Sequence, residues 1–150
     1  MNNQNPIGST FEMALRLLLL TDECHHFPLK LEQLCCIDFI AVYAADFGLF
    51  DENLHGYGIF RFSEFPARKK LVDKASKWLT LIKFLNFNQD KSGYTYTIAT
   101  AGKKFASHLK SPYAEEYRLA VQTVIKNYNF SESAMTTAIH QRSIASLQER

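Results

Sequence analysis

Two short runs of alternating β-forming residues lie between long stretches of helical periodicity, and this order restricts the possible folds more than any other feature. The runs are FLNFN and YTYTI, and the polar residues QDKSG between them indicate a β-hairpin. Thr100 is a suitable N-cap for a helix over AGKKFASHLK. Its residues Phe105, Ala106 and Leu109 are expected to face inward. A strand pair that passes directly into a basic helix is therefore predicted.

Helical periodicity dominates the rest of the chain. A first helix is expected to begin near Ser9 or Thr10, either of which can cap it, and to end between residues 25 and 28. A second, apolar almost all round, is expected from Leu29 to Gly48, a natural C′ residue. Further helices are predicted over residues 67–85 and 113–128.

The stretch LFDENLHGYGIFRFSEFP breaks this periodicity and separates the second and third helices. Its aromatic residues predict a loop with an apolar underside, and the alternation in IFRFSEF allows a short edge strand. His55 is interpreted as a surface-loop histidine.

The third predicted helix has two neighbouring faces of different character. One is an apolar seam: Leu71, Ala75, Trp78 and Ile82. The other is a basic row about 100° away, made of Lys70, Lys74 and Lys77. A solvated face is the common meaning of such a row, but between residues 67 and 87 Asp73 is the one acidic side chain.

The chain of 150 residues is of single-domain size, and 47% hydrophobic residues suffice for a core. We predict a flexible arm over residues 1–8, a folded domain over 9–128 and a polar C-terminal helix or tail over 129–150. The fold class is mainly α with a small β-hairpin wing. The phrase YTIATAG is similar to the joint between wing and helix in winged-helix regulators, so the domain is expected to be winged-helix-like with an extra C-terminal helix.

Charge is distributed unevenly along the chain. Residues 1–60 hold two Lys/Arg and eight Asp/Glu, whereas residues 61–110 hold eleven and three. A basic middle segment favours contact with a polyanion or with an acidic protein surface. Three cysteines, none in a C-x-x-C spacing, fit a reduced cytoplasm, and no signal peptide or membrane-spanning segment is recognisable.

No catalytic or cofactor-binding motif is evident, so we expect no enzymatic activity, no cofactor and no metal site. Asp38 and Asp46 would lie about 80° apart around one helix, which is unsuitable for paired acid–base chemistry. Asp38 is either buried and hydrogen-bonded or the polar anchor of a partner interface. Cys24, His25 and His26 are consecutive, so their side chains diverge and do not form a metal site.

Two surfaces remain as candidates for function. A nucleic-acid surface would use phosphate contacts from Arg68, Lys70, Lys74, Lys77, Lys83, Lys91, Lys103 and Lys104. A partner-binding surface would use Asp38, Asp46, Phe60 and Phe62. Against sequence-specific DNA binding, about 18 residues separate the second and third helices, where a helix-turn-helix needs about 3–4.

Four stretches that together span about residues 5–128 carry a family resemblance: NPIGSTFEMALRLLLLTDE, LEQLCCIDFIAVYAADFG followed by NLHG, FPARKKLVDKASKWLTLIKFL, and YTIATAGKKFASHLKSPYAEEYRLAVQTVI. They resemble the Middle Component 2 group of bacterial ABC-three-component systems. The DFG at residues 46–48 and the SPYA at residues 111–114 are the more specific parts.

The resemblance implies a non-catalytic adaptor. Members of the group are accessory subunits encoded with an SMC- or RecF-like ABC ATPase and a third, effector-bearing protein in anti-phage or anti-plasmid defence, to which the Lamassu system is related. DNA contact through the basic face is an accompanying hypothesis. The alternative is a stand-alone winged-helix transcriptional regulator.

Overall fold

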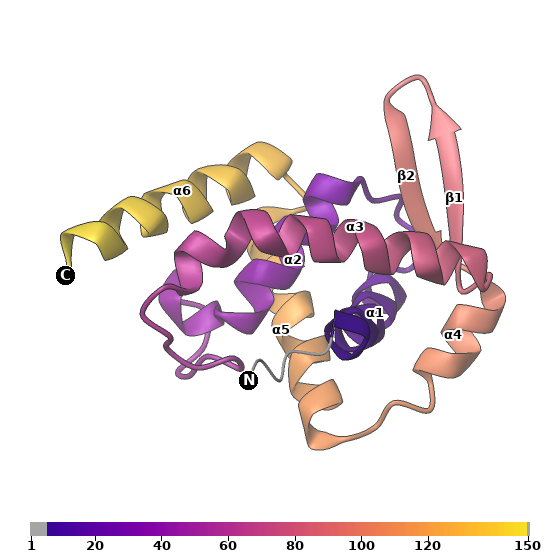
Figure 1. Cartoon of the computed structure of the whole chain (residues 1–150), viewed down its shortest axis with the longest axis horizontal. Coiled ribbons are helices and arrows are strands. Elements are labelled where there is room, and N and C mark those ends of the chain that lie inside the picture. The colour runs from indigo at the N-terminus through magenta and orange to yellow at the C-terminus, as the bar shows by residue number, and fades with distance from the viewer. Residues whose placement is uncertain (1–5, 150) are drawn as a thin grey trace.

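A computed structural model describes residues 6–149. Over this range the chain forms six α-helices and one hairpin, which projects from one end of the helical body, and two short 3₁₀ helices lie in the connections (Figure 1). The elements are α1 (Pro6–Glu23), α2 (Leu31–Val42), η1 (Ala44–Phe47), η2 (Arg61–Glu64), α3 (Phe65–Leu81), β1 (Leu85–Asp90), β2 (Gly93–Ile98), α4 (Thr100–Ala106), α5 (Pro112–Tyr128) and α6 (Glu132–Gln148). The predicted fold class, mainly α with a small β-hairpin, is confirmed.

Helix α1 begins at Pro6, a few residues before the predicted cap. Proline suits the first turn of a helix, because the amide hydrogen that it lacks would have no partner there. Residues 1–5 of the predicted arm lie outside the described residues.

Helix α2 is the central element, and every residue from Leu34 to Val42 is buried. The prediction that it continues to Gly48 is wrong, because it ends at Val42 and η1 follows. The side-chain oxygen of Asn53 accepts hydrogen bonds from the backbone amides of Ala45 (2.8 Å) and Asp46 (3.3 Å), which in a longer helix would bond to α2 carbonyls. Gly48 then adopts the left-handed conformation, with φ +73°.

Helix α3 buries a face that only partly matches the predicted seam, because Ala75 is buried and Leu71 packs against the core but Ile82 is exposed. Its buried residues are Val72, Ala75, Ser76 and Leu79, whereas Trp78 is 38% exposed. The helix packs against α1, α2 and β1, so its apolar residues are divided among several neighbours. The outer part of the predicted seam stays in contact with solvent.

The hairpin has a shorter connection than predicted. β1 and β2 pair in antiparallel register from Leu85 opposite Ile98 to Asp90 opposite Gly93. Two residues form the turn, and the Asp90 carboxylate accepts a hydrogen bond from the Ser92 amide at 2.7 Å. On its other edge β2 pairs with a residue from between α1 and α2, because the amides and carbonyls of Leu29 and Tyr96 exchange two hydrogen bonds of 2.8 and 3.0 Å.

The glycine in YTIATAG is Gly102, and close packing requires a residue without a side chain at this position. A β-carbon at this position would collide with the backbone carbonyl oxygen of Phe84. The absence of a side chain therefore lets α4 lie against the chain where it leaves α3.

The connection between η1 and α3 contains no strand, so the edge strand allowed by IFRFSEF is wrong. The backbone forms local three-residue hydrogen bonds instead, from Arg61 to Gly58 (3.1 Å) and from Ser63 to Phe60 (3.0 Å). These bonds turn the Phe62 side chain beneath the connection, where it is buried.

The segment after Asn129, for which the sequence left a helix or a tail open, forms helix α6 (Figure 1). The Ser131 side chain caps it by accepting a hydrogen bond from the Ala134 amide. Met135 and Ile139 are buried, and the helix packs on α2 and on both 3₁₀ helices. Within residues 6–149 no helix has both the length and the hydropathy of a membrane span.

Candidate functional site

The carboxylate of Asp38 joins four helices at the centre of the protein. It lies on α2 and is buried. Arg16 on α1 donates through Nε to Oδ1 at 2.9 Å, and Arg68 on α3 donates through Nη1 to Oδ2 at 3.3 Å. The Tyr117 hydroxyl on α5 donates to Oδ1 at 2.7 Å. Burial with hydrogen bonds is thus the arrangement observed for Asp38.

Electrostatics keep this buried carboxylate ionised. Burial by itself raises the pKa of Asp38, but the charge and hydrogen bond of Arg16, the charge of Arg68 and the hydrogen bond of Tyr117 together bring it below its ordinary value. For Arg16, burial lowers the pKa and the Asp38 carboxylate more than restores it. The Asp38 carboxylate and the two guanidinium groups of Arg16 and Arg68 are therefore all ionised, and together they leave a net charge of +1.

A second row of hydrogen bonds extends from Arg68 to the surface. Its Nη2 lies 3.4 Å from the Tyr43 hydroxyl and 3.3 Å from His55 Nδ1. Because a guanidinium donates and never accepts, Nδ1 must be the acceptor and Nε2 carries the imidazole proton. That Nε2 donates to the Tyr113 hydroxyl at 2.6 Å. His55 is thus part of the network, in contrast to its interpretation as a surface-loop residue.

His55 is neutral in this position. Burial, followed by the charges of Arg16 and Arg68, lowers its pKa to about 4. The imidazole therefore adds no charge to the network at neutral pH, and its tautomer is determined by Arg68 on one side and Tyr113 on the other.

A pocket of about 470 Å³ lies beside this network. Residues of α1 and of the connection between α4 and α5 line it. Apolar lining comes mainly from Leu15, Leu19, Leu109 and Ala114, and polar groups come from Arg16, His55 and Tyr113. A smaller hollow of about 440 Å³ on the α3 side shares Arg16 and His55.

Sequence reasoning did not find this pocket. Its lining residues come from α1, from the loop after η1 and from the start of α5, which are far apart in the chain. No local pattern in the sequence indicates that these segments meet.

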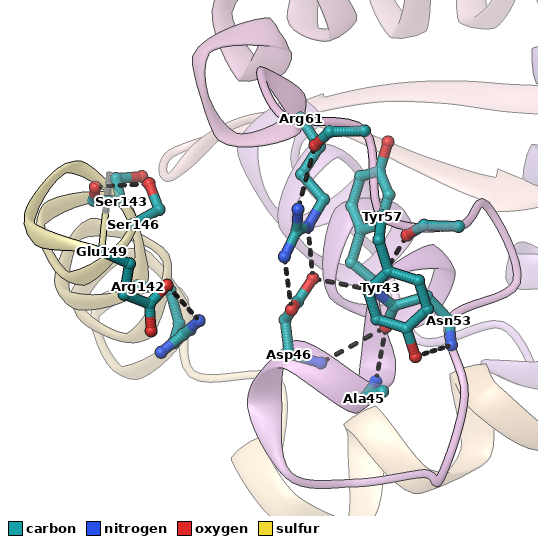
Figure 2. Close-up of polar contacts among 12 residues, drawn as sticks. Tyr43, Ala45, Asp46, Asn53, Tyr57, Arg61, Arg142, Ser143, Ser146 and Glu149 are labelled. Atoms are coloured by element: carbon teal, nitrogen blue, oxygen red, sulfur yellow. Dashed lines mark hydrogen bonds and ion pairs between the residues drawn. The ribbon is translucent and has the colours of Figure 1, made fainter.

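A second ionic network holds the loop between η1 and η2 (Figure 2). The Asp46 carboxylate accepts two hydrogen bonds from Arg61, at 2.7 and 2.8 Å, and a third from the Asn53 amide at 2.8 Å. Figure 2 shows these side chains converging from the two ends of the loop, with Arg142 and Glu149 of α6 in a separate group. Asp46 therefore holds the two ends of the loop together through these hydrogen bonds.

A third network joins α1 to α4 and α5. Arg118 binds Asp22 at 2.9 Å and Glu23 at 2.6 Å, and it also donates to the Ala106 carbonyl at 3.0 Å. Lys103 binds the same Asp22 at 2.8 Å. Burial raises the pKa of Asp22, but these two cations lower it below its ordinary value.

The chain matches a known protein family. A family model described as ABC-three component (ABC-3C) system Middle Component 2 matches residues 6–149. The chain belongs to this family. The match includes α6, which the resemblance in the sequence did not reach. No curated protein and no solved structure matches the chain. As a middle component, it is one part of a system of several components, which implies protein partners.

In this Middle Component 2 protein the predicted nucleic-acid-binding residues do not form one group. The side chain of Arg68 faces inward to Asp38, Lys103 is paired with Asp22, and Lys77 is paired with Asp73 at 2.9 Å. Lys77 and Lys103 stay exposed despite these pairs. The other five are exposed as well: Lys70, Lys74, Lys83, Lys91 and Lys104.

The predicted partner-binding residues are similarly divided. Asp38 and Phe62 are buried, and Asp46 is held by Arg61. Phe60 is 61% exposed. Three of the four side chains therefore organise the interior or the loop.

The three thiols of the Middle Component 2 chain are inside the fold. Cys24, Cys35 and Cys36 are all buried. Burial, with a smaller contribution from nearby acidic residues, raises the pKa of Cys24 and that of Cys35 to about 12. These thiols are protonated at neutral pH, and thiolates are the nucleophilic form.

Proposed function

We propose that this protein is a non-catalytic accessory subunit of an anti-phage or anti-plasmid defence complex. It binds an ABC ATPase of the SMC or RecF type and bridges it to a third, effector-bearing component in the cytoplasm. Membership of the Middle Component 2 family supports the accessory role. The ionic networks also support it, because their charged groups pair with one another and hold elements of the fold together.

An exposed apolar patch is the surface feature that supports the proposed binding of the ATPase. Large apolar side chains remain exposed where the start of α1 meets the end of α3: Phe11 (46%), Trp78 (38%), Leu81 (80%) and Ile82 (40%). The rings of Phe11 and Trp78 are in contact, with centroids 6.2 Å apart. Trp78, Leu81 and Ile82 follow a three- and four-residue spacing and so share one side of the helix. An exposed apolar patch on a protein with a complete core is typical of a protein–protein interface.

DNA contact is a second candidate, favoured by a different observation. Lys70 and Lys74 are exposed along α3, and Lys91 is exposed at the tip of the hairpin. The pairing of Leu29 with β2 supports a winged-helix-like arrangement of helices and wing. In this arrangement the lysines would contact the phosphate backbone, either within the complex or in a stand-alone transcriptional regulator. The inward orientation of Arg68 argues against base recognition by that side chain.

The test is affinity purification of the tagged chain from its native host, with and without nuclease, followed by mass spectrometry. We expect recovery of an ABC ATPase that resists nuclease, and its loss in the variant Leu81→Glu. Leu119→Glu, at a 56% exposed position on α5, is the matched control and should retain the ATPase.

Each variant should melt at the temperature of the unchanged protein, because both leucines are exposed. Equal recovery with Leu81→Glu would exclude the apolar patch from the interface. A homodimer without the ATPase that releases DNA on nuclease treatment would support the regulator instead.

A further inference from the structure

The pocket over α1 combines the features of a small-molecule site. Its volume of about 470 Å³ lies within the usual range of about 300–1,000 Å³ for ligand pockets. Leucines form most of its apolar lining, and Arg16, His55 and Tyr113 bring their polar groups together at one side. Apolar walls with a few convergent polar groups favour an organic molecule with one polar end.

The direction of the hydrogen bonds indicates which polar end fits. Arg68 donates to His55, so His55 must donate to Tyr113. The Tyr113 oxygen is thus an acceptor in that bond, and its own hydrogen is available as a donor. Because Tyr113 lines the pocket, its hydroxyl can donate a hydrogen bond to an acceptor on a ligand bound there.

The charged residues around the pocket indicate the charge of the ligand. Arg16 and Arg68 share the single carboxylate of Asp38, and Arg16 lines the pocket while its side chain is 10% exposed. One uncompensated positive charge in a poorly hydrated place favours one negative charge on the ligand. Glu12 and Lys110 also line the pocket and are exposed. Because their opposite charges offset each other, the excess stays at about one positive charge, which disfavours a doubly charged ligand such as phosphate.

We propose that this pocket binds an organic monocarboxylate, with the carboxylate at Arg16 and Tyr113 and the apolar body against Leu15, Leu19 and Leu109. The bound acid would contact α1, His55 of the loop after η1 and the start of α5 at once. Occupancy would therefore stabilise the arrangement of three segments that are distant in the chain. The site is independent of the proposed ATPase interface, so either proposal can fail without the other.

The test is calorimetric titration of the full chain with hexanoate and with hexanamide, which has the same shape and no charge. We expect saturable binding of hexanoate and binding of the amide at least about tenfold weaker, because a charge-assisted hydrogen bond is about twice as strong as a neutral one. Inorganic phosphate should bind more weakly than hexanoate. Equal binding of acid and amide, tighter binding of phosphate, or no saturable binding of hexanoate at millimolar concentration would each overturn the proposal.

Two variants test the placement of the carboxylate. Tyr113→Phe should weaken hexanoate binding by about tenfold, and Glu12→Gln should strengthen it several-fold by removing a like charge. Glu132→Gln, an exposed change on α6 outside the pocket lining, is the matched control and should change nothing. Melting curves establish that each variant is folded. Unchanged affinity in both Tyr113→Phe and Glu12→Gln would place any binding elsewhere and contradict the proposal.

Discussion

The carboxylate of Asp38 on α2 accepts a hydrogen bond of 2.7 Å from the hydroxyl of Tyr117 on α5, 79 residues further along the chain. The same carboxylate holds Arg16 and Arg68, so one acidic group determines how four helices meet. Breaking a buried pair from one side costs more than the pair contributes, because the remaining charge stays buried without compensation. The core of this protein therefore depends strongly on the charge of Asp38.

Replacing Asp38 by Ala should lower the free energy of unfolding by about 3–5 kcal/mol, because two guanidinium groups lose their counter-charge. Urea denaturation followed by circular dichroism measures this change. Asp73→Ala is the control, since its exposed pair with Lys77 should contribute about 0–1 kcal/mol. Similar losses in the two variants would contradict a special role for the buried pair.

Replacing Tyr117 by Phe separates the hydrogen bond from the charge. The change keeps the ring, which is fully buried, and removes the hydroxyl that donates to Asp38. A hydrogen bond to a charged group contributes about 1.5–3 kcal/mol, so the loss should be smaller than for Asp38→Ala. A variant as stable as the unchanged protein would show that the guanidinium groups alone satisfy the carboxylate.

Lowering the pH should reduce the free energy of unfolding over the pH range in which His55 becomes protonated. Its pKa is about 4 in the folded protein and about 6.5 in an unfolded chain, so the neutral form is favoured by folding. The resulting stability is present above pH 6.5 and is lost as the pH falls from 6.5 towards 4. The loss should amount to about 2 kcal/mol, allowing for partial exposure of the ring.

Urea denaturation at several pH values between 7 and 4 tests this prediction. His55→Gln should flatten the pH dependence, whereas His140→Gln, at an exposed position, should leave it unchanged. The lowered pKa values of Asp38 and Asp22 act at lower pH, below 3.8. An unaltered pH dependence in His55→Gln would show that another group titrates in this range.

Replacing Gly102 by Ala should destabilise the protein although alanine is the better helix former by about 1 kcal/mol. The added β-carbon collides with the carbonyl of Phe84, and relief requires α4 to move away from the end of α3. A loss of about 1–3 kcal/mol is expected from such overpacking. Thermal melting measures it, and a gain in stability would show that α4 moves without cost.

The three cysteines should resist modification in the native protein. Burial raises the pKa of Cys24 and that of Cys35 to about 12, and Cys36 is also buried. A thiol reagent at pH 8 should therefore react only after denaturant is added. Rapid modification of the native chain would indicate local opening of α2 or of the end of α1.

Local signals in the sequence predicted much of the secondary structure. The alternation in YTYTI was sufficient for β2, and the helical periodicity over residues 113–128 was sufficient for α5. The helix end at Val42 was missed because Asn53, eleven residues later, supplies the competing hydrogen bonds. The buried face of α3 was predicted only in part, because α1, α2 and β1 all contact this helix and divide its apolar side chains among them.

By itself, then, the sequence determined the order of the helices and the hairpin, which depends on neighbouring residues, and the family to which the chain belongs. The tertiary structure decided which charges meet. Periodicity marks Asp38 as a polar residue on an apolar helix, but its partners Arg16, Arg68 and Tyr117 come from three other helices. Electrostatic pairing depends on distance in space, and distance along the chain does not reveal it.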